Sequence, residues 1–226
     1  MVDSATEFRK NSFNDEDSAS LALVASTLQN VADEAISAGD AASFLISQMT
    51  AFDFSADKAM YIADSINAVS NSFSVSSGDL INNLGNVSAA LAVTGNSFEE
   101  TLGLMVAGTE VTRNATKISR GLVSVQSRFN QIVDETSSVG KNLLNWYKEH
   151  EIAVYDQEGQ LRTLYDTLND VAEIWPTLTK NEQAYYLNQQ AGELMPLQSI
   201  YAGTCLEPYI LNYNRDIIVA WPIIMV

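Results

Sequence analysis

The stretch from residue 73 to residue 114 contains two amphipathic helical patterns that are joined by one tight corner. In the first pattern, apolar residues recur at spacings that place them on one face of a helix; they are Leu80, Leu84, Val87 and Leu91. The second pattern follows the corner and contains Phe98, Leu102, Met105 and Val106. Because each apolar face must be buried against another element, this stretch predicts a helical hairpin.

Four residues form the corner of this hairpin: Gly95, Asn96, Ser97 and Glu100. Gly95-Asn96 is expected to end the first helix, because glycine readily adopts the left-handed conformation found at many helix ends. Ser97 and Glu100 have the S-x-x-E spacing of a capping box, in which each side chain accepts a hydrogen bond from the other residue's backbone N–H. The corner has no obvious catalytic group, and we interpret it as a structural site.

Similar patterns extend to both sides of the hairpin. Asp15 to Ser18 is expected to open a helix whose apolar face continues to Ala35, since acidic groups are favourable at the positive N-terminus of a helix. Gly39-Asp40 is expected to end one helix and to cap the next. After Asn114, the pattern predicts one amphipathic helix of about 25 residues that ends near Gly140.

The segment from 141 to 192 mixes helical patterns with a short strand-like run. Ile152 to Tyr155 has the residue types of a strand, and the turn-forming residues that follow it predict a small β-turn or hairpin element near 152–161. A helix over 161–175 is expected to stop before Pro176, and Thr179 is expected to cap another. The whole chain therefore predicts a mostly α fold, a bundle of about nine short amphipathic helices.

Charge and composition limit the kinds of partner. The chain of 226 residues has 28 acidic and 12 basic residues and a net charge of −16. Direct binding to nucleic acid or to an anionic membrane surface is not expected, because phosphate contacts require Lys and Arg. No apolar run approaches the roughly 20 residues that a membrane-spanning helix needs.

Residue types and spacing give no support to a catalytic or metal site. His150 and Cys205 are each the only residue of their kind, which excludes a zinc site of the usual Cys and His composition. A Ser-His-Asp triad would have to use His150, and the chain has no G-x-S-x-G motif. Gly103 and Gly108 lie in a helical pattern without the lysine of a phosphate-binding loop. We therefore predict no catalytic residue, no metal site and no cofactor.

Two groups of charges each allow two interpretations. The acidic residues at positions 15–17 are either a helix-start cluster or a cation site. The cations after the hairpin are either a patch for a partner or charges that balance an acidic neighbouring helix. These cations are Arg113, Lys117, Arg120 and Arg128.

A series of short blocks resembles the conserved core of phage tail tape-measure proteins. The first is the corner from Gly95 to Thr101 with the Ala/Gly-rich helix that follows it. The later blocks are 152–162, then Leu164, Tyr165 and Leu168, then 174–179 and Ala191-Gly192. Their order and spacing resemble the family from about Phe8 to about Gly192. The family's long helical arms are not present, and Glu193 to Pro196 stands where its basic, glutamine-containing continuation is expected. The chain is thus expected to be a core fragment or a truncated product.

The resemblance implies a structural protein of a phage or prophage tail. Such a protein occupies the tail lumen, sets tail length during assembly and takes part in genome delivery; it is made in the host bacterial cytoplasm and ends in the virion. Implied partners are other tape-measure copies and the tail-tube, chaperone and baseplate proteins. Two alternatives stay open: a tail-associated cell-wall hydrolase module that uses two carboxylates, and a generic α-helical interaction module.

The same patterns suggest three segments. Residues 1–140 are expected to form a helical domain similar to the tape-measure core, and residues 141–192 a helical subdomain with the short β element. Residues 193–226 are an atypical apolar tail, densest from Ile217 to Val226. This tail is expected to be out-of-family sequence left by truncation, with a strand or an interface segment as the alternatives.

Overall fold

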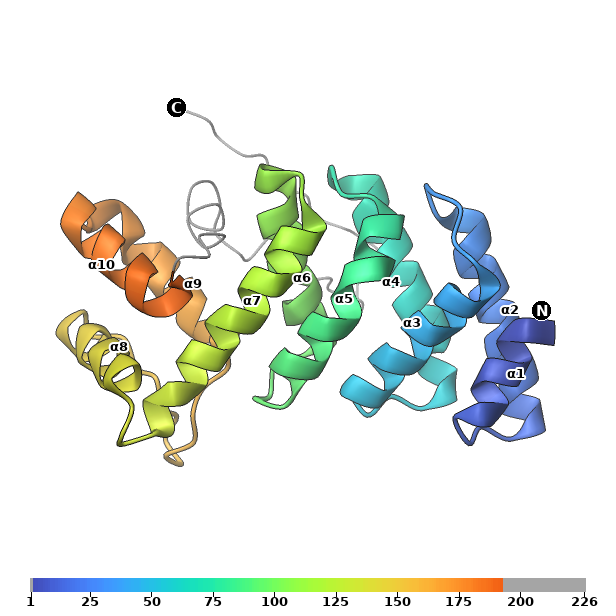
Figure 1. Cartoon of the computed structure of the whole chain (residues 1–226), viewed down its shortest axis with the longest axis horizontal. Coiled ribbons are helices and arrows are strands. Elements are labelled where there is room, and N and C mark those ends of the chain that lie inside the picture. The colour runs from blue at the N-terminus through green and yellow to red at the C-terminus, as the bar shows by residue number, and fades with distance from the viewer. Residues whose placement is uncertain (1, 193–226) are drawn as a thin grey trace. The chain divides into compact units, whose positions relative to one another are not determined.

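The computed structural model describes residues 2–192 and confirms a mostly α fold (Figure 1). In the first part of the chain the helices are α1 (Val2–Lys10), α2 (Asp15–Val31), α3 (Ala38–Ala51), η1 (Ala56–Lys58), α4 (Ala59–Ser72) and α5 (Ser77–Ala92). They are followed by α6 (Phe98–Thr112), α7 (Ala115–Asn130), η2 (Gln131–Val133), α8 (Ser138–Glu149), α9 (Leu164–Ile174), η3 (Trp175–Thr177) and α10 (Lys180–Ala191). Elements η1 to η3 are single turns of 3-10 helix. The predictions for Cys205 and for the tail 193–226 lie outside the described residues.

The chain divides into two compact units, Met1–Ala89 and Ala90–Val226. The domain boundary expected at residue 140 stays a prediction. In the first unit, α1 packs on α2 and α3, and α2 also packs on α4. The core of this unit consists of fully buried side chains, among them Phe8, Leu21, Leu28, Leu45, Ile62 and Ile66. Helix α1 was not expected from the sequence; with it, the described residues contain ten α-helices.

The first unit corrects the prediction for Gly39-Asp40. Helix α2 ends at Val31, and α3 begins at Ala38, so both residues lie in the first turn of α3. The N-cap is Ser37, whose Oγ accepts a hydrogen bond from the backbone N–H of Asp40 at 3.0 Å. A serine hydroxyl satisfies one of the free N–H groups of a helix start, and this side chain begins the helix two residues before the glycine.

The second unit is organised around α6, the second helix of the predicted hairpin. Residues 101–109 of α6 are all buried, so the helix is covered on every side. Helices α7 and α9 pack on it, and α7 packs in turn on α8 and α10. Gly108 allows α7 to pack closely against α6. A Cβ on Gly108 would lie only 2.8 Å from two side-chain carbons of Ile118 in α7.

The single long helix expected after Asn114 is wrong. Helix α7 ends at Asn130, η2 adds one turn, and Gly140 lies inside α8. The break comes from side chains that offer acceptors to nearby backbone. The Oδ1 atom of Asp134 accepts from the backbone N–H of Thr136 at 2.8 Å, and Ser137 caps α8 by accepting from the N–H of Gly140 at 3.1 Å.

The small β-turn or hairpin element expected near 152–161 is present as a turn with one isolated antiparallel bridge, Tyr155 to Leu161. The Oδ1 atom of Asp156 accepts from the backbone N–H groups of Glu158 and Gln160 at 2.9 and 2.8 Å. The expected turn chemistry is therefore present, while no strand occurs among residues 2–192. Helix α9 follows and ends at Ile174, two residues before Pro176, close to the expected stop.

Candidate functional site

The corner between α5 and α6 contains both hydrogen bonds of a capping box. The Oγ atom of Ser97 accepts from the backbone N–H of Glu100 at 3.1 Å, and Oε2 of Glu100 accepts from the N–H of Ser97 at 2.8 Å. Gly95 has φ +83°, in the left-handed region that favours glycine. The local geometry expected for this corner is present; its part in function stays a proposal.

Asn96 has a role that its sequence pattern did not indicate. Its side chain is buried, and Nδ2 donates to the carbonyl of Leu91 at 3.0 Å and to Oγ1 of Thr94 at 3.1 Å. Its Oδ1 accepts from the backbone N–H of Tyr165, in the first turn of α9, at 3.0 Å. One asparagine therefore satisfies the end of α5 and the beginning of α9 together.

Glu100 lies beside the first turn of α9 and is half-buried. Burial raises the pKa of its carboxyl, and the carboxylates of Asp166 and Glu99 raise it further. The hydrogen bonds from Ser97 act in the opposite direction. A raised carboxyl pKa is common in functional sites and also in structural networks. Here Glu100 has a defined structural partner in Ser97.

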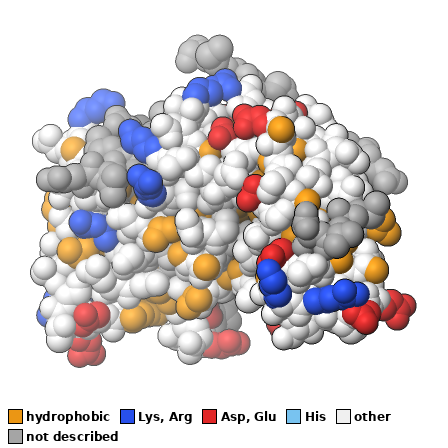
Figure 2. All heavy atoms as spheres, turned by 45° about the vertical axis from the view of Figure 1, so that its right-hand side comes forward, with side chains coloured by type: hydrophobic (Ala, Val, Ile, Leu, Met, Phe, Trp, Pro, Cys, Tyr) orange, Lys and Arg blue, Asp and Glu red, His pale blue; other side chains and the backbone are white. Residues whose placement is uncertain are grey.

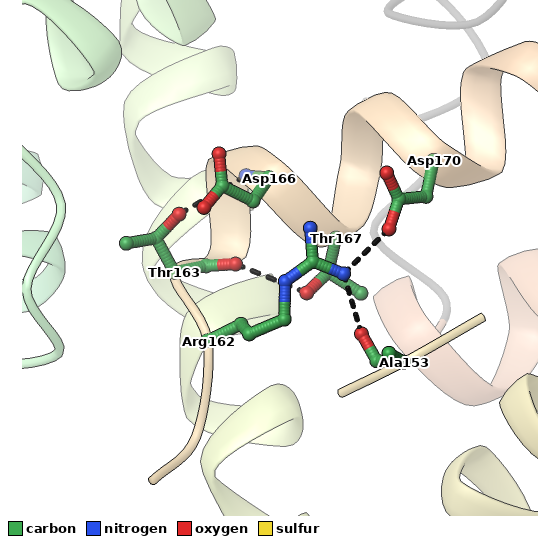
Figure 3. A network of polar contacts seen from close by, with 6 residues as sticks. All are labelled: Ala153, Arg162, Thr163, Asp166, Thr167 and Asp170. Carbon is green, nitrogen blue, oxygen red and sulfur yellow. Dashed lines mark hydrogen bonds and ion pairs between the residues drawn. The ribbon is translucent and has the colours of Figure 1, made fainter. Parts of the chain in front are cut away.

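Arg162 connects the turn of residues 153–162 to α9 (Figure 3). Its Nη1 donates to the carbonyl of Ala153 and to Oδ2 of Asp170, both at 2.6 Å. Thr163 caps α9: its Oγ1 accepts from the N–H of Asp166 at 3.0 Å, as the labelled side chains in Figure 3 show. The structure thus joins the corner and the later turn, two separate blocks of the sequence, at the beginning of one helix.

A buried polar network lies where α7, α8 and α10 pack. The hydroxyl groups of Tyr147 and Tyr186 are 3.0 Å apart, and the hydroxyl of Tyr147 donates to Oε1 of Gln190 at 3.0 Å. Nε2 of Gln190 donates to the carbonyl of Val125 at 3.1 Å. Burial raises the pKa of Tyr147 well above 10.0, and the neighbouring Tyr186 adds to this effect.

A cavity of about 510 Å³ opens between α8 and α10. Two carboxylates line it, Glu149 and Glu182, together with His150. Glu182 forms a second capping box with Thr179, whose hydroxyl and backbone N–H both donate to Oε2 at 2.7 Å. These hydrogen bonds lower the pKa of Glu182. His150 follows the end of α8; its ring stacks on Trp146 with centroids 4.1 Å apart.

Comparison with known protein families decides what kind of chain this is. A model of the phage-related minor tail protein family matches residues 1–192. The chain belongs to this family. No solved structure matches it.

Two groups of charges in this minor tail protein have local structural partners. Asp15 to Asp17 form the first turn of α2, capped by Asn14, and no group of three metal-ligating side chains occurs within residues 2–192. Arg128 is half-buried and donates to the carbonyl of Gln189, near the end of α10, at 3.0 Å. On the face drawn in Figure 2, the coloured Lys and Arg side chains form separate small groups.

Within residues 2–192, no helix combines the length and the apolar character that crossing a bilayer demands.

The buried network predicts how stability responds to alkaline pH. Because the pKa of Tyr147 is raised in the folded chain, the unfolded chain loses this proton first, and the free energy of unfolding falls as pH rises above about 10. The stabilisation by protonated Tyr147 is fully present below about pH 10. It is lost progressively as the pH rises from there to the pKa of Tyr147 in the folded chain. Tyr147→Phe should therefore flatten the decline by up to about 1.4 kcal/mol per pH unit. Urea unfolding between pH 9 and pH 11.5 measures this slope.

The control is Tyr155→Phe, which removes an exposed tyrosine from the same unit. An equal slope in the wild-type chain and in Tyr147→Phe would contradict the role of the buried hydroxyl.

Proposed function

We propose that this chain is the conserved core of a tape-measure protein, which acts in phage tail assembly and length determination and in genome delivery. The observation that carries the proposal is that two independently found stretches of the chain cover almost the same residues. The family match covers residues 1–192, and the blocks that resemble tape-measure cores run from about Phe8 to about Gly192. Membership in a tail protein family makes a structural role in the tail the natural starting point.

The fold supports a division of roles between this core and helical segments outside it. The longest helix of the described residues, α2, has 17 residues and therefore rises about 25 Å. Helices this short, packed side by side, do not convert residue count into tail length. An extended helical arm does, at about 1.5 Å per residue. In this proposal the arm is the ruler, and the core packs with other copies and with tail-tube, chaperone and baseplate proteins in the tail lumen.

The contacts between the corner and the later turn support a structural role for the core. The corner and the turn of residues 153–162 meet at the start of α9 through hydrogen bonds to backbone groups, such as that from the N–H of Tyr165 to Asn96. Such bonds hold helices in fixed positions. A core built in this way presents a defined surface to neighbouring proteins.

The hydrolase alternative receives no comparable support from the cavity between α8 and α10. A glycan hydrolase needs one carboxyl group with a raised pKa as its general acid. Glu182 has a lowered pKa, and its Oε2 is occupied by Thr179. This arrangement suits a helix cap.

Core variants in the phage gene that encodes this segment test the proposal. Gly95→Val places a β-branched residue at φ +83° and should be costly, whereas Ser97→Ala should cost about 1 kcal/mol by loss of a cap. We expect fewer tails with Gly95→Val, a smaller reduction with Ser97→Ala, and unchanged length of the tails that form. Electron microscopy measures both quantities, with the exposed Gln157→Ala as the control. Normal numbers of tails of altered length would show that the hairpin is part of the ruler and would contradict this division of roles.

A further inference from the structure

The cavity between α8 and α10 is rich in acceptors and carries negative charge. Glu149 is exposed at its edge, at the end of α8. Both hydrogen bonds from Thr179 to Glu182 go to Oε2, which leaves Oε1 for another donor. Among the described residues, no lysine or arginine lines this cavity. Its field therefore favours a positively charged ligand and disfavours an anion.

Aromatic rings supply a second feature of the cavity. Trp146 is 4% exposed and packs against His150 and Tyr186, with ring centroids 4.1 and 4.3 Å away. Tyr185, in contrast, is 46% exposed, so its ring is accessible to a ligand. Planar cationic groups stack well on such rings.

A third feature is an unsatisfied buried donor. Trp146 lines the cavity, and its buried indole N–H has no hydrogen-bond partner in the described part of the chain. A buried polar group without a partner is uncommon and calls for an explanation. An indole N–H can only donate, so its natural complement is a carbonyl or another acceptor brought by a ligand.

We propose that this cavity binds an arginine side chain within a basic peptide segment of a partner protein. A guanidinium group offers five donors in a plane and stacks on aromatic rings, which matches the carboxylates of Glu149 and Glu182 and the exposed ring of Tyr185. The peptide also brings backbone carbonyl acceptors for the donors of the wall. A volume of about 510 Å³ has room for one long side chain with its backbone. The inference does not depend on the tape-measure role.

Amide side chains complete the wall and allow the binding to be followed. Asn142, Asn145 and Asn181 line the cavity. Their amide oxygens can accept from a guanidinium group, and their NH₂ groups give separate signals in a proton–nitrogen NMR spectrum. The indole N–H of Trp146 is a further reporter at the wall.

The test is a titration of the complete ¹⁵N-labelled chain with N-acetyl-arginine N-methylamide, followed at these side-chain signals. Saturable shifts are expected. Glu149→Gln removes a charged contact and Tyr185→Ser removes the stacking ring, so each should weaken binding about tenfold. Both residues are exposed, so both variants should fold. The matched control is Glu158→Gln, an exposed glutamate outside the cavity, which should bind the probe as the wild type does.

Two further probes separate this proposal from other ligands. N-acetyl-norleucine N-methylamide has a similar shape without the charge and should cause no saturable shift. N-acetylglucosamine tests a neutral sugar. The proposal is wrong if the arginine probe leaves the reporters unchanged, if the uncharged probe or the sugar binds as tightly, or if Glu149→Gln and Glu158→Gln have the same effect.

Discussion

Gly140→Ala is expected to destabilise the second unit by about 3 kcal/mol or more. A Cβ at this position would lie 1.9 Å from the carbonyl oxygen of Gln131 and 2.5 Å from its carbonyl carbon. Both are backbone atoms of η2, so no flexible side chain can move aside. The start of α8 and η2 would have to separate, which would weaken the packing of α8 on α7.

Tryptophan fluorescence during urea unfolding measures this effect, because all three tryptophans of the chain follow residue 140. Gly39→Ala is the control for a helical glycine without such a contact: its nearest contact would be Ser37 Oγ at 3.7 Å, within α3. Because Gly39 lies in the first unit, which has no tryptophan, urea unfolding of this variant is followed by circular dichroism. Alanine there should be neutral or stabilising by up to about 1 kcal/mol. If Gly140→Ala unfolded at the same urea concentration as the wild type, Gly140 would not lie this close to the backbone of Gln131 in solution.

Asn96→Ala is expected to cost about 2 to 3 kcal/mol, because it leaves the backbone N–H of Tyr165 without its partner. The carbonyl of Leu91 loses one donor but keeps the hydroxyl of Thr94. Ser97→Ala, one residue later, removes only an exposed cap and should cost about 1 kcal/mol. Asn96→Asp keeps the acceptor for Tyr165 but places a second buried carboxylate oxygen against the carbonyl of Leu91, so it should also cost more than Ser97→Ala.

The same urea measurement ranks the three variants. A free energy of unfolding for Asn96→Ala equal to that of Ser97→Ala would mean that Asn96 does not link α5 and α9 in solution.

Local features of this fold could be predicted, because their causes lie within a few residues. The capping boxes of Ser97 with Glu100 and of Thr179 with Glu182 each involve positions three apart. Their side chains compete only with water for the same backbone groups, so spacing alone is informative. The left-handed conformation of Gly95 is equally local.

Features that depend on distant residues could not be predicted in this way. The bond between Asn96 and Tyr165 joins positions 69 apart, and Gly140 is needed only because Gln131 lies against it. The alternation of buried and exposed side chains at residues 152–155 lies between these two cases. Ile152 and Val154 are buried while Ala153 and Tyr155 are exposed, as in a strand. The pattern was present, but only one bridge, to Leu161, pairs with it.

The most direct test of the central claim, that this is the core of a tape-measure protein, is the length of the tail itself. In a phage gene that encodes this core with a helical arm, an in-frame deletion of about 70 residues from the arm should shorten the tail by roughly 100 Å, at 1.5 Å per residue. Electron microscopy of the assembled tails measures this length. Shortening in proportion to the deletion is the predicted result, and tails of unchanged length would contradict the account.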